Sequence, residues 1–258
     1  MQKREFYTDK MTELQLSSTS KGNQRKWLTD DIYVKECFFF QGRFWKDNLV
    51  ECIASEIGKK LTNKVPVLEY GPAQICENGR WTEGCYSKNF CLPDEKYIPF
   101  QRLMESKDLY LDFRCDYKEK YNFVVDNMEM ITGLPCREYI NTMIFMDYLV
   151  GNEDRHFNNF GILYRKGQYR LGPLFDFGLG LFEHDDKYEG RPFRECLALM
   201  ESKPFSADNE LIMDYILKDW EPCVKHVDLG RCLIPSPKAG SYIRNRCLHL
   251  GIELEGVD

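Results

Sequence analysis

The sequence has no long apolar run and no closely paired cysteines, and these two absences exclude several protein classes. No apolar stretch approaches the roughly 20 residues that a membrane-spanning helix requires. The charged start, MQKREFYTDKMTEL, has no apolar core of a secretory signal peptide. The net charge of −6 also argues against a general nucleic-acid-binding protein, since such proteins are normally basic. We therefore expect a cytoplasmic protein that contacts no membrane and makes no direct sequence-specific contact with nucleic acid.

The 11 cysteines include no C-x-x-C pair, the spacing that structural zinc sites commonly use. Cys76, Cys85 and Cys91 form a loose group, but their spacing fits no usual ligand pattern. An odd number of cysteines would leave at least one free thiol in a secreted chain. We expect reduced thiols, several of them packed as small hydrophobic side chains.

What is present is the composition of a folded chain, with 43% hydrophobic and 14% aromatic residues. Up to about residue 98 the pattern favours strands, as in DIYVKECFFF, and one helix in KDNLVECIASEIGKKL. Beyond that point helices dominate, and the clearest begins near Pro135 and ends at Gly151. Further helices are predicted in 118–132, 194–202, 207–227 and 236–254. We predict an α+β fold with a β-rich N-lobe, residues 1–98, and a mostly helical C-lobe, residues 99–258.

Polar residues crowd the segment GNEDRHFNNFGILY, which runs directly into a predicted β-hairpin. Asn159 precedes the first strand of the hairpin and Asp176 ends the second, so two strands of similar length bring them close together. Carboxylate and amide oxygens are ligands that Mg²⁺ prefers, together with water and phosphate. Asp154, five residues before Asn159, is poorly placed for the same ion but well placed to orient an attacking hydroxyl. This division of roles is that of phosphoryl transfer.

The same residues form a motif, N-x-D-x-H-x-x-N, followed by Pro173 and the D-F-G sequence at Asp176. The segment resembles the catalytic segment of the HipA family of bacterial serine/threonine kinases. The resemblance implies a two-lobed protein-kinase-like fold that uses ATP and Mg²⁺. It implies Asp154 as the catalytic base and Asn159 and Asp176 as magnesium ligands. His156 joins the catalytic set as a support of the loop, with Arg155.

A kinase site also needs nucleotide contacts earlier in the chain. Lys35, in a strand-like run before a helix, is the candidate for the phosphates, and its partner is Glu51, Glu56 or Asp47. We favour Glu51, since the resemblance leads one to expect an acid early in the helix. The loop SSTSKGNQ contains one glycine and is neither a G-x-G-x-x-G loop nor a P-loop. Its position is that of a loop covering the phosphates. The basic residues beside it, Lys26 included, either attract nucleotide or form a solvated turn. The predicted ATP-binding residues of this loop are Ser18, Thr19, Ser20, Lys21 and Gly22.

The resemblance covers about residues 17–185 and implies a kinase acting on Ser or Thr hydroxyls of a protein, with autophosphorylation. A Ser or Thr within 17–20 is one candidate for the modified residue, and an antitoxin or regulator is a candidate partner. The D-R-H-x-x-N and D-F-G pairing is also similar to that of phosphatidylinositol kinases, so a lipid or small-molecule kinase is an alternative. A nucleotide-binding pseudokinase or toxin–antitoxin binding module is a second alternative. No A-P-E segment follows D-F-G, so the protein-substrate platform of eukaryotic-type kinases cannot be read from the sequence.

Overall fold

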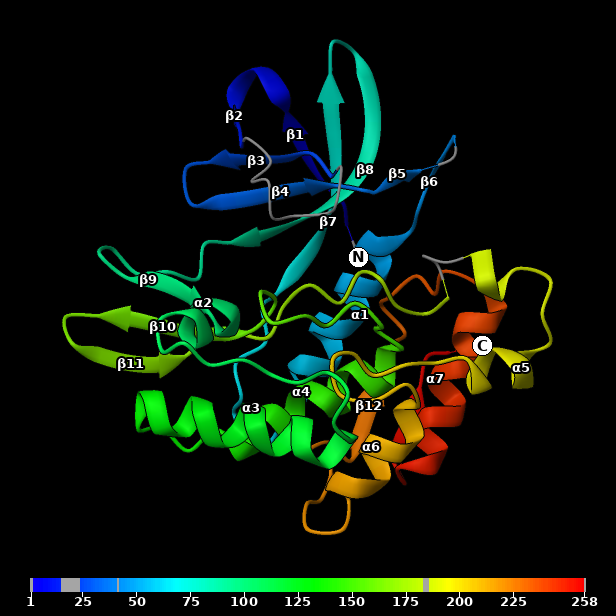
Figure 1. The fold of residues 1–258 in the computed structure, drawn as a ribbon. Coiled ribbons are helices and arrows are strands. Elements are labelled where there is room, and N and C mark those ends of the chain that lie inside the picture. The colour runs from blue at the N-terminus through cyan, green and yellow to red at the C-terminus, as the bar shows by residue number, and fades with distance from the viewer. Residues whose placement is uncertain (1, 15–23, 41, 183–185, 258) are drawn as a thin grey trace.

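A six-stranded sheet forms the first part of the chain in the computed structural model, which describes residues 2–14, 24–40, 42–182 and 186–257. The order of its strands is β1-β7-β8-β4-β3-β2; β1 runs parallel to β7, and the other pairs are antiparallel. Figure 1 shows this sheet on one side of the molecule and most of the helices on the other. The strands are β1 (Arg4–Tyr7), β2 (Thr12–Glu13), β3 (Lys26–Thr29), β4 (Ile32–Glu36), β7 (Tyr70–Glu77) and β8 (Arg80–Lys88).

The two faces of this sheet differ, because successive side chains of a strand point to opposite sides. Trp27 on β3 and Val34 on β4 are cross-strand partners, and they belong to a small buried cluster with Phe6, Ala73 and Ile75. Lys26 and Lys35, the next pair along, are also partners and therefore lie on the other face. The sheet thus presents two lysines away from its own apolar cluster.

The predicted first helix is present as α1 (Asp47–Gly58), and it packs against β7 and β8. Its apolar residues Val50, Ile53, Ala54 and Ile57 are buried in the main core. A short hairpin, β5 (Phe39–Phe40) and β6 (Arg43–Phe44), precedes it, and a 3₁₀ turn, η1 (Thr8–Lys10), follows β1.

The predicted hairpin is also present, as β10 (Gly161–Arg165) and β11 (Gln168–Leu171) joined at Lys166 and Gly167. The prediction that Asp176 ends the second strand is wrong, because β11 ends at Leu171 and Asp176 lies beyond it. A third strand, β9 (Lys96–Pro99), pairs with β10 and completes a separate sheet, so the lobe boundary predicted at residue 98 falls within this strand. Gly161 is required here, because a Cβ at this position would meet the carbonyl oxygen of Ile98 at 2.2 Å.

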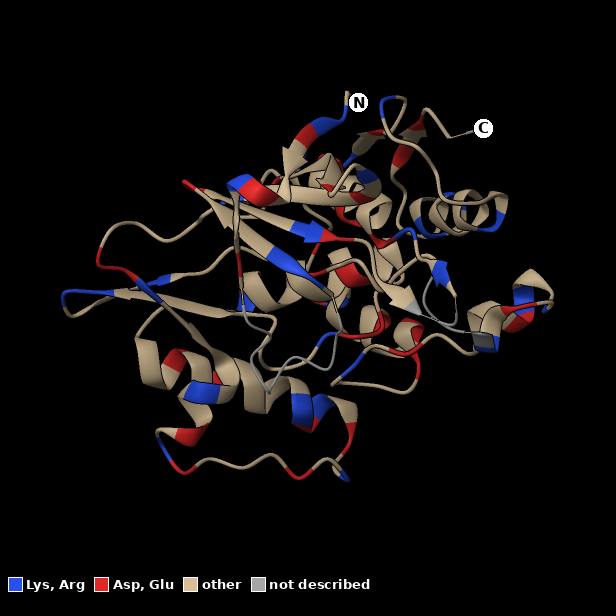
Figure 2. Cartoon of the chain, turned by 90° about the horizontal axis from the view of Figure 1, so that it is seen from above, with Lys and Arg blue, Asp and Glu red and all other residues tan. Residues whose placement is uncertain are grey.

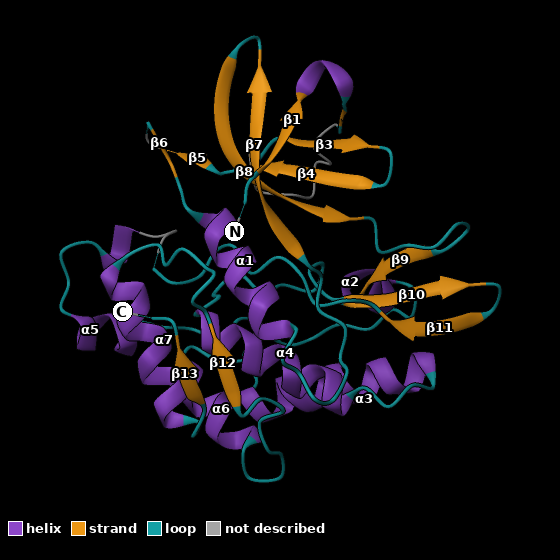
Figure 3. Ribbon diagram, turned by 180° about the vertical axis from the view of Figure 1, so that it is seen from behind, coloured by secondary structure: helices purple, strands orange, loops and turns teal. Residues whose placement is uncertain are grey.

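Most of the remaining regular structure is helical, and α4 (Arg137–Val150) is its centre (Figure 3). Every residue of α4 from Tyr139 to Val150 is buried, Asp147 included. As predicted, a glycine ends this helix: Gly151 takes a left-handed conformation with φ +58°. The other helices are α2 (Phe100–Glu105), α3 (Tyr117–Thr132), η2 (Asp186–Tyr188), α5 (Phe193–Ala198), α6 (Asn209–Ile216) and α7 (Pro237–His249). No helix in the described ranges is both long and apolar enough to cross a membrane.

The helix predicted over 194–202 ends early, at Ala198 in α5, and two further predicted helices are too long. The helix predicted over 207–227 ends at Ile216 in α6, and the segment that follows contains Pro222, which lacks a backbone N–H and disfavours a helical residue before it. The helix predicted over 236–254 ends at His249 in α7. The chain beyond each helix forms a strand, β12 (His226–Asp228) or β13 (Glu253–Glu255), and these two strands pair in parallel.

Candidate active site

The polar segment that follows α4 is held by the buried carboxylate of Asp147. Asn152 Nδ2 donates to Asp147 Oδ1 at 2.7 Å, and Arg155 donates to both carboxylate oxygens, at 2.7 and 2.9 Å. Between these two buried residues, Asp154 is exposed, and its backbone N–H donates to Asn152 Oδ1 at 3.3 Å. The loop is therefore fixed from beneath while the Asp154 carboxylate is left accessible.

Arg155 also connects this loop to the segment of Asp176. Its Nη1 donates to the carbonyl oxygens of Asn159, at 3.0 Å, and of Phe175, at 2.6 Å, and its guanidinium lies 4.8 Å from the ring centroid of Phe177. Burial works against the charge of Arg155, but the Asp147 carboxylate outweighs it and raises the pKa. One buried guanidinium thus brings together the backbones next to Asn159 and Asp176.

Lys35 lies at the centre of a second group of charges. Its Nζ is 3.0 Å from Asp176 Oδ1 and 3.2 Å from Glu51 Oε1. Glu51 is fully buried, and its other oxygen accepts a hydrogen bond from the backbone N–H of Phe177 at 3.0 Å. Of the three acids considered for Lys35, Glu51 is the one in contact, whereas Glu56 pairs with Lys59.

Asp47, the third acid, accepts from the backbone N–H of Phe38 at 3.0 Å and from the side chain of Gln24. It is buried, which raises its pKa against the opposing effect of Lys35. Asp47 also limits the space at Gly178, where a Cβ would lie 3.1 Å from Asp47 Cβ and 3.3 Å from Glu51 Oε1. The start of α1 and the D-F-G segment are therefore in close contact.

The pKa values of this group follow from its burial and its charges. Burial would raise the pKa of Asp176, but the ammonium groups of Lys35 and Lys26 outweigh it and hold the pKa below its usual range. Burial likewise opposes the charge of Lys35, yet Asp176 and Glu51 raise its pKa well above its usual value. Burial raises the pKa of Glu51, and Lys35 counteracts this only in part. An ammonium facing two carboxylates is thus the dominant charge arrangement.

The sequence allows Lys26 either a contact with nucleotide or a place in a solvated turn. It lies on β3, paired with Lys35, and not in a turn. Burial lowers its pKa, and the neighbouring charge of Lys35 lowers it further. Lys26, Trp27 and Leu28 show no polar–apolar alternation, because Trp27 and Leu28 are both apolar, so the sequence next to the Ser/Gly loop does not separate strand from turn.

The remaining predicted residues are divided between the loop and the part of the chain outside the described residues. Asn159 is buried, and its Nδ2 donates to the carbonyl oxygen of Asp154 at 3.3 Å, which leaves Oδ1 as the atom that could bind a cation. His156 is exposed, and its Nδ1 accepts from the backbone N–H of Asn158 at 3.3 Å. Ser18, Thr19, Ser20, Lys21 and Gly22 lie outside the described residues.

Magnesium is the metal that these donors suit. Asp176 supplies a carboxylate whose side chain is 36% exposed, and its backbone is left-handed, with φ +63°. That conformation is uncommon for a residue other than glycine and often occurs at functional sites. No group of three His, Cys, Asp or Glu suited to a metal is found among the described residues, so a cation here would depend on one carboxylate, one amide, phosphate and water.

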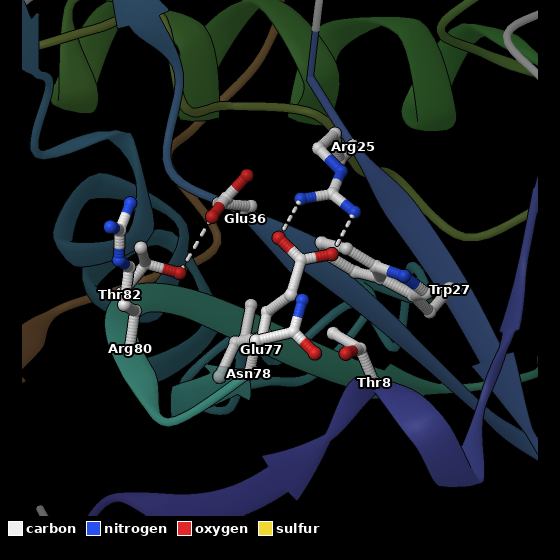
Figure 4. A pocket seen from close by; sticks show the side chains of 9 residues that line it. Thr8, Arg25, Trp27, Glu36, Glu77, Asn78, Arg80 and Thr82 are labelled. Atoms are coloured by element: carbon white, nitrogen blue, oxygen red, sulfur yellow. Dashed lines mark hydrogen bonds and ion pairs between the residues drawn. The ribbon is translucent and has the colours of Figure 1, made fainter.

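A pocket of about 430 Å³ lies on the opposite face of the six-stranded sheet, at Trp27 (Figure 4). Its charged side chains largely satisfy one another: Arg25 donates to both carboxylate oxygens of Glu77, at 2.6 and 2.7 Å, and Thr82 donates to Glu36 at 2.6 Å. Since Trp27 and Lys35 point to opposite faces, this pocket is separate from the Lys35 group.

Comparison with solved structures reveals the fold of a kinase. The chain is similar to CtkA, a proinflammatory kinase of Helicobacter pylori, with a TM-score of 0.53 and 18% identity over 72% of this chain and 64% of that one. HipA of Shewanella oneidensis MR-1, in a structure with HipB and operator DNA, matches with a TM-score of 0.44 and 14% identity. That match covers 93% of this chain and 55% of the HipA chain.

No family model and no curated protein matches the sequence. The chain spans less than two thirds of the length of either solved protein. At 18% identity the likeness to CtkA establishes the fold and leaves activity and substrate open. The likeness to CtkA confirms the predicted kinase fold.

Proposed function

We propose that this chain is a kinase that uses ATP and Mg²⁺ to phosphorylate Ser or Thr hydroxyls of a protein, its own included. The observation that carries the proposal is the contact of Lys35 with both Glu51 and Asp176. Arg155 joins this group to the loop of Asp154 and Asn159. The two-lobed arrangement, with ATP between residues 1–98 and 99–258, belongs to the same proposal.

In this proposal each residue has a defined task. Lys35 holds the α- and β-phosphates, and Glu51 holds Lys35 in position through their 3.2 Å contact. Asn159 and Asp176 hold Mg²⁺, which neutralises phosphate charge when bound. Lys26 adds a second cation beside Lys35. The loop of Ser18, Thr19, Ser20, Lys21 and Gly22 covers the phosphates, and His156 and Arg155 support the catalytic loop.

Asp154 orients the acceptor hydroxyl, and its exposure makes it accessible to a protein substrate. The hydroxyl oxygen forms a bond to the γ-phosphorus as the bond from that phosphorus to the β–γ bridging oxygen breaks. ADP leaves with the electron pair of the broken bond. The hydroxyl proton passes to the Asp154 carboxylate and from there to solvent.

The experiment that tests the proposal is mass spectrometry of the intact and digested chain after incubation with Mg-ATP. The wild type should gain phosphate on a Ser or Thr, and Asp154→Asn and Asp176→Ala should gain none. Asp112→Asn is the matched control, because Asp112 is an exposed acid paired with Arg114 on the surface. Phosphate transfer that survives both Asp154→Asn and Asp176→Ala would refute the proposal.

A lipid or small-molecule kinase would use the same Asp154, Asn159 and Asp176. Figure 2 shows basic and acidic residues interspersed over the described elements, an arrangement that does not favour an anionic membrane surface. Labelled phosphate appearing in a lipid extract and in no protein would support this alternative.

Stabilisation by Mg-ATP without transfer to any acceptor would instead support a binding module, with an antitoxin or regulator as its partner. A cytoplasmic location remains part of the proposal.

A further inference from the structure

A second pocket, of about 370 Å³, lies directly beside Asp154. Its described lining includes Asp154 but not Lys35, Asn159 or Asp176, the residues proposed for the phosphates and the metal. The pocket therefore borders Asp154 without including the residues proposed for the phosphates and the metal. The lining residues are Gln101, Phe113, Asp154, Arg155, His156, Phe157, Asn158, Lys203 and Pro204.

One wall of this pocket is a tight turn that the buried Glu153 attaches to the catalytic loop. Glu153 Oε1 accepts from the backbone N–H of Glu201 at 2.9 Å. Ser202 and Ser206 then pair through their backbones, at 2.9 and 2.8 Å, and Phe205 between them is buried in the core. The turn is fixed at its base and presents Lys203 and Pro204 to the pocket.

Lys203 is the accessible cation of this lining. Its side chain is 57% exposed, and its ion pair with Glu201, at 3.1 Å, lies at the surface, where such pairs are weak. A carboxylate arriving with a substrate can therefore displace Glu201 at little cost. Arg155 cannot bind a substrate in this way, because its guanidinium already donates to the Asp147 carboxylate and to backbone carbonyl oxygens.

Another part of the lining is aromatic. Phe113 is 60% exposed and stacks on the buried Phe157, with ring centroids 6.2 Å apart and planes at 29°. Gln101 and Asn158, which have amide side chains, line the pocket with it, and Gln101 Nε2 donates to Glu105 at the surface, at 3.0 Å. An exposed aromatic side chain, two amides and one cation are groups that bind an extended peptide, since the amides pair with backbone groups and the others with side chains.

We infer that this pocket binds the acceptor and selects peptide segments in which an acidic side chain flanks the Ser or Thr. The acidic side chain contacts Lys203, an apolar neighbour packs on Phe113, and the hydroxyl reaches Asp154. This inference rests on the proposed kinase function and adds a substrate class to it. The chemical step is the transfer described above, with the peptide hydroxyl as the acceptor.

The test is a set of Ser-containing peptides in which Glu, Ala or Lys replaces each flanking residue in turn, assayed with Mg-ATP by phosphate incorporation. For the wild type, kcat/KM of the best Glu peptide should exceed that of its Lys counterpart at least about tenfold, because a like charge opposite Lys203 is unfavourable. Lys203→Glu should reverse the order. Lys225→Glu is the matched control, since Lys225 is 74% exposed and lies outside the pocket lining, and it should keep the wild-type order.

A gain of activity on Lys peptides cannot come from partial unfolding, so the reversal separates specificity from damage. An unchanged order in Lys203→Glu, with transfer still measurable, would overturn the inference and leave the kinase proposal standing. Transfer to lipid and to no peptide would overturn the substrate class alone. Absence of any transfer by the wild type, to peptides or to itself, would overturn both.

Discussion

Replacing Arg155 with Met removes the connection between α4, the catalytic loop and the D-F-G segment. Arg155 is 1% exposed and makes two hydrogen bonds to the Asp147 carboxylate and one to each of two carbonyl oxygens. Met fills a similar volume without donors. The change therefore leaves a buried carboxylate whose remaining side-chain donor is Asn152, at 2.7 Å.

The expected cost follows from the burial of this ion pair. Removing one partner of a buried pair usually costs about 3–5 kcal/mol, because the other charge is left uncompensated. For a chain of this length, roughly 2–4 °C of Tm is lost per kcal/mol, so we expect a fall of about 6–20 °C. Arg114→Met is the control: Arg114 also contacts its acid, Asp112, but is 90% exposed, and such pairs contribute about 1 kcal/mol or less.

The assay is thermal unfolding of Arg155→Met, Asp147→Leu and the double variant, together with phosphate transfer. The double variant should recover much of the stability, since replacing both buried charges with apolar residues is often neutral. Transfer should stay lost in it, because nothing then joins the carbonyls of Asn159 and Phe175. A loss of stability in Arg155→Met no larger than that in Arg114→Met would refute the reasoning, as would full activity of the double variant.

Three further predictions concern other parts of the chain. Asp176→Asn should lower the Tm more at pH 7 than at pH 3, because the lysines hold the pKa of Asp176 below its ordinary 3.8 despite its burial. The stability contributed by the carboxylate is fully present above the ordinary pKa of 3.8 and is lost as the pH falls through the lowered pKa. Gly180→Ala should cost about 1–3 kcal/mol in chemical unfolding, because its Cβ would lie 2.3 Å from the carbonyl oxygen of Val150 and backbone must move. In a thiol titration of the native chain, the four half-buried cysteines should react before the seven buried ones, whose thiols become reactive on unfolding. The four half-buried cysteines are Cys76, Cys91, Cys115 and Cys232.

The elements predicted best from the sequence are those with local signals at both ends. The central helix has Pro135 before it and Gly151 after it, and the hairpin has Lys166 and Gly167 at its turn. The strand β9 has no such signal for its partner, because its pairing with β10 joins residues more than sixty positions apart. The same applies to β12 and β13, whose short sequences gain their structure from each other.

In the candidate site, β11 ends at Leu171, so the hairpin alone does not bring Asp176 to Asn159. The buried Arg155 connects the two segments by binding the carbonyl oxygens of Asn159 and Phe175. The sequence pattern does not decide which helix acid contacts Lys35, since the side of the helix that faces Lys35 depends on how α1 packs against the sheet. Lys26 illustrates the same limit: its contribution depends on the cross-strand pairing with Lys35. The roles of these residues in catalysis stay predictions until transfer is measured.

The alternation of burial around Asp154 explains why so much polar chemistry borders an apolar strand. Glu153 and Arg155, on either side of it, are both buried and charged, and each binds a different part of the chain. Glu153 holds the turn of Lys203 through the backbone of Glu201, whereas Arg155 holds the D-F-G segment through the carbonyl of Phe175. Neither side chain is available to a substrate, and their opposite charges act on separate partners. Asp154 is thus exposed between two fixed points, so the turn of Lys203 and the D-F-G segment can each be altered without changing the Asp154 carboxylate itself.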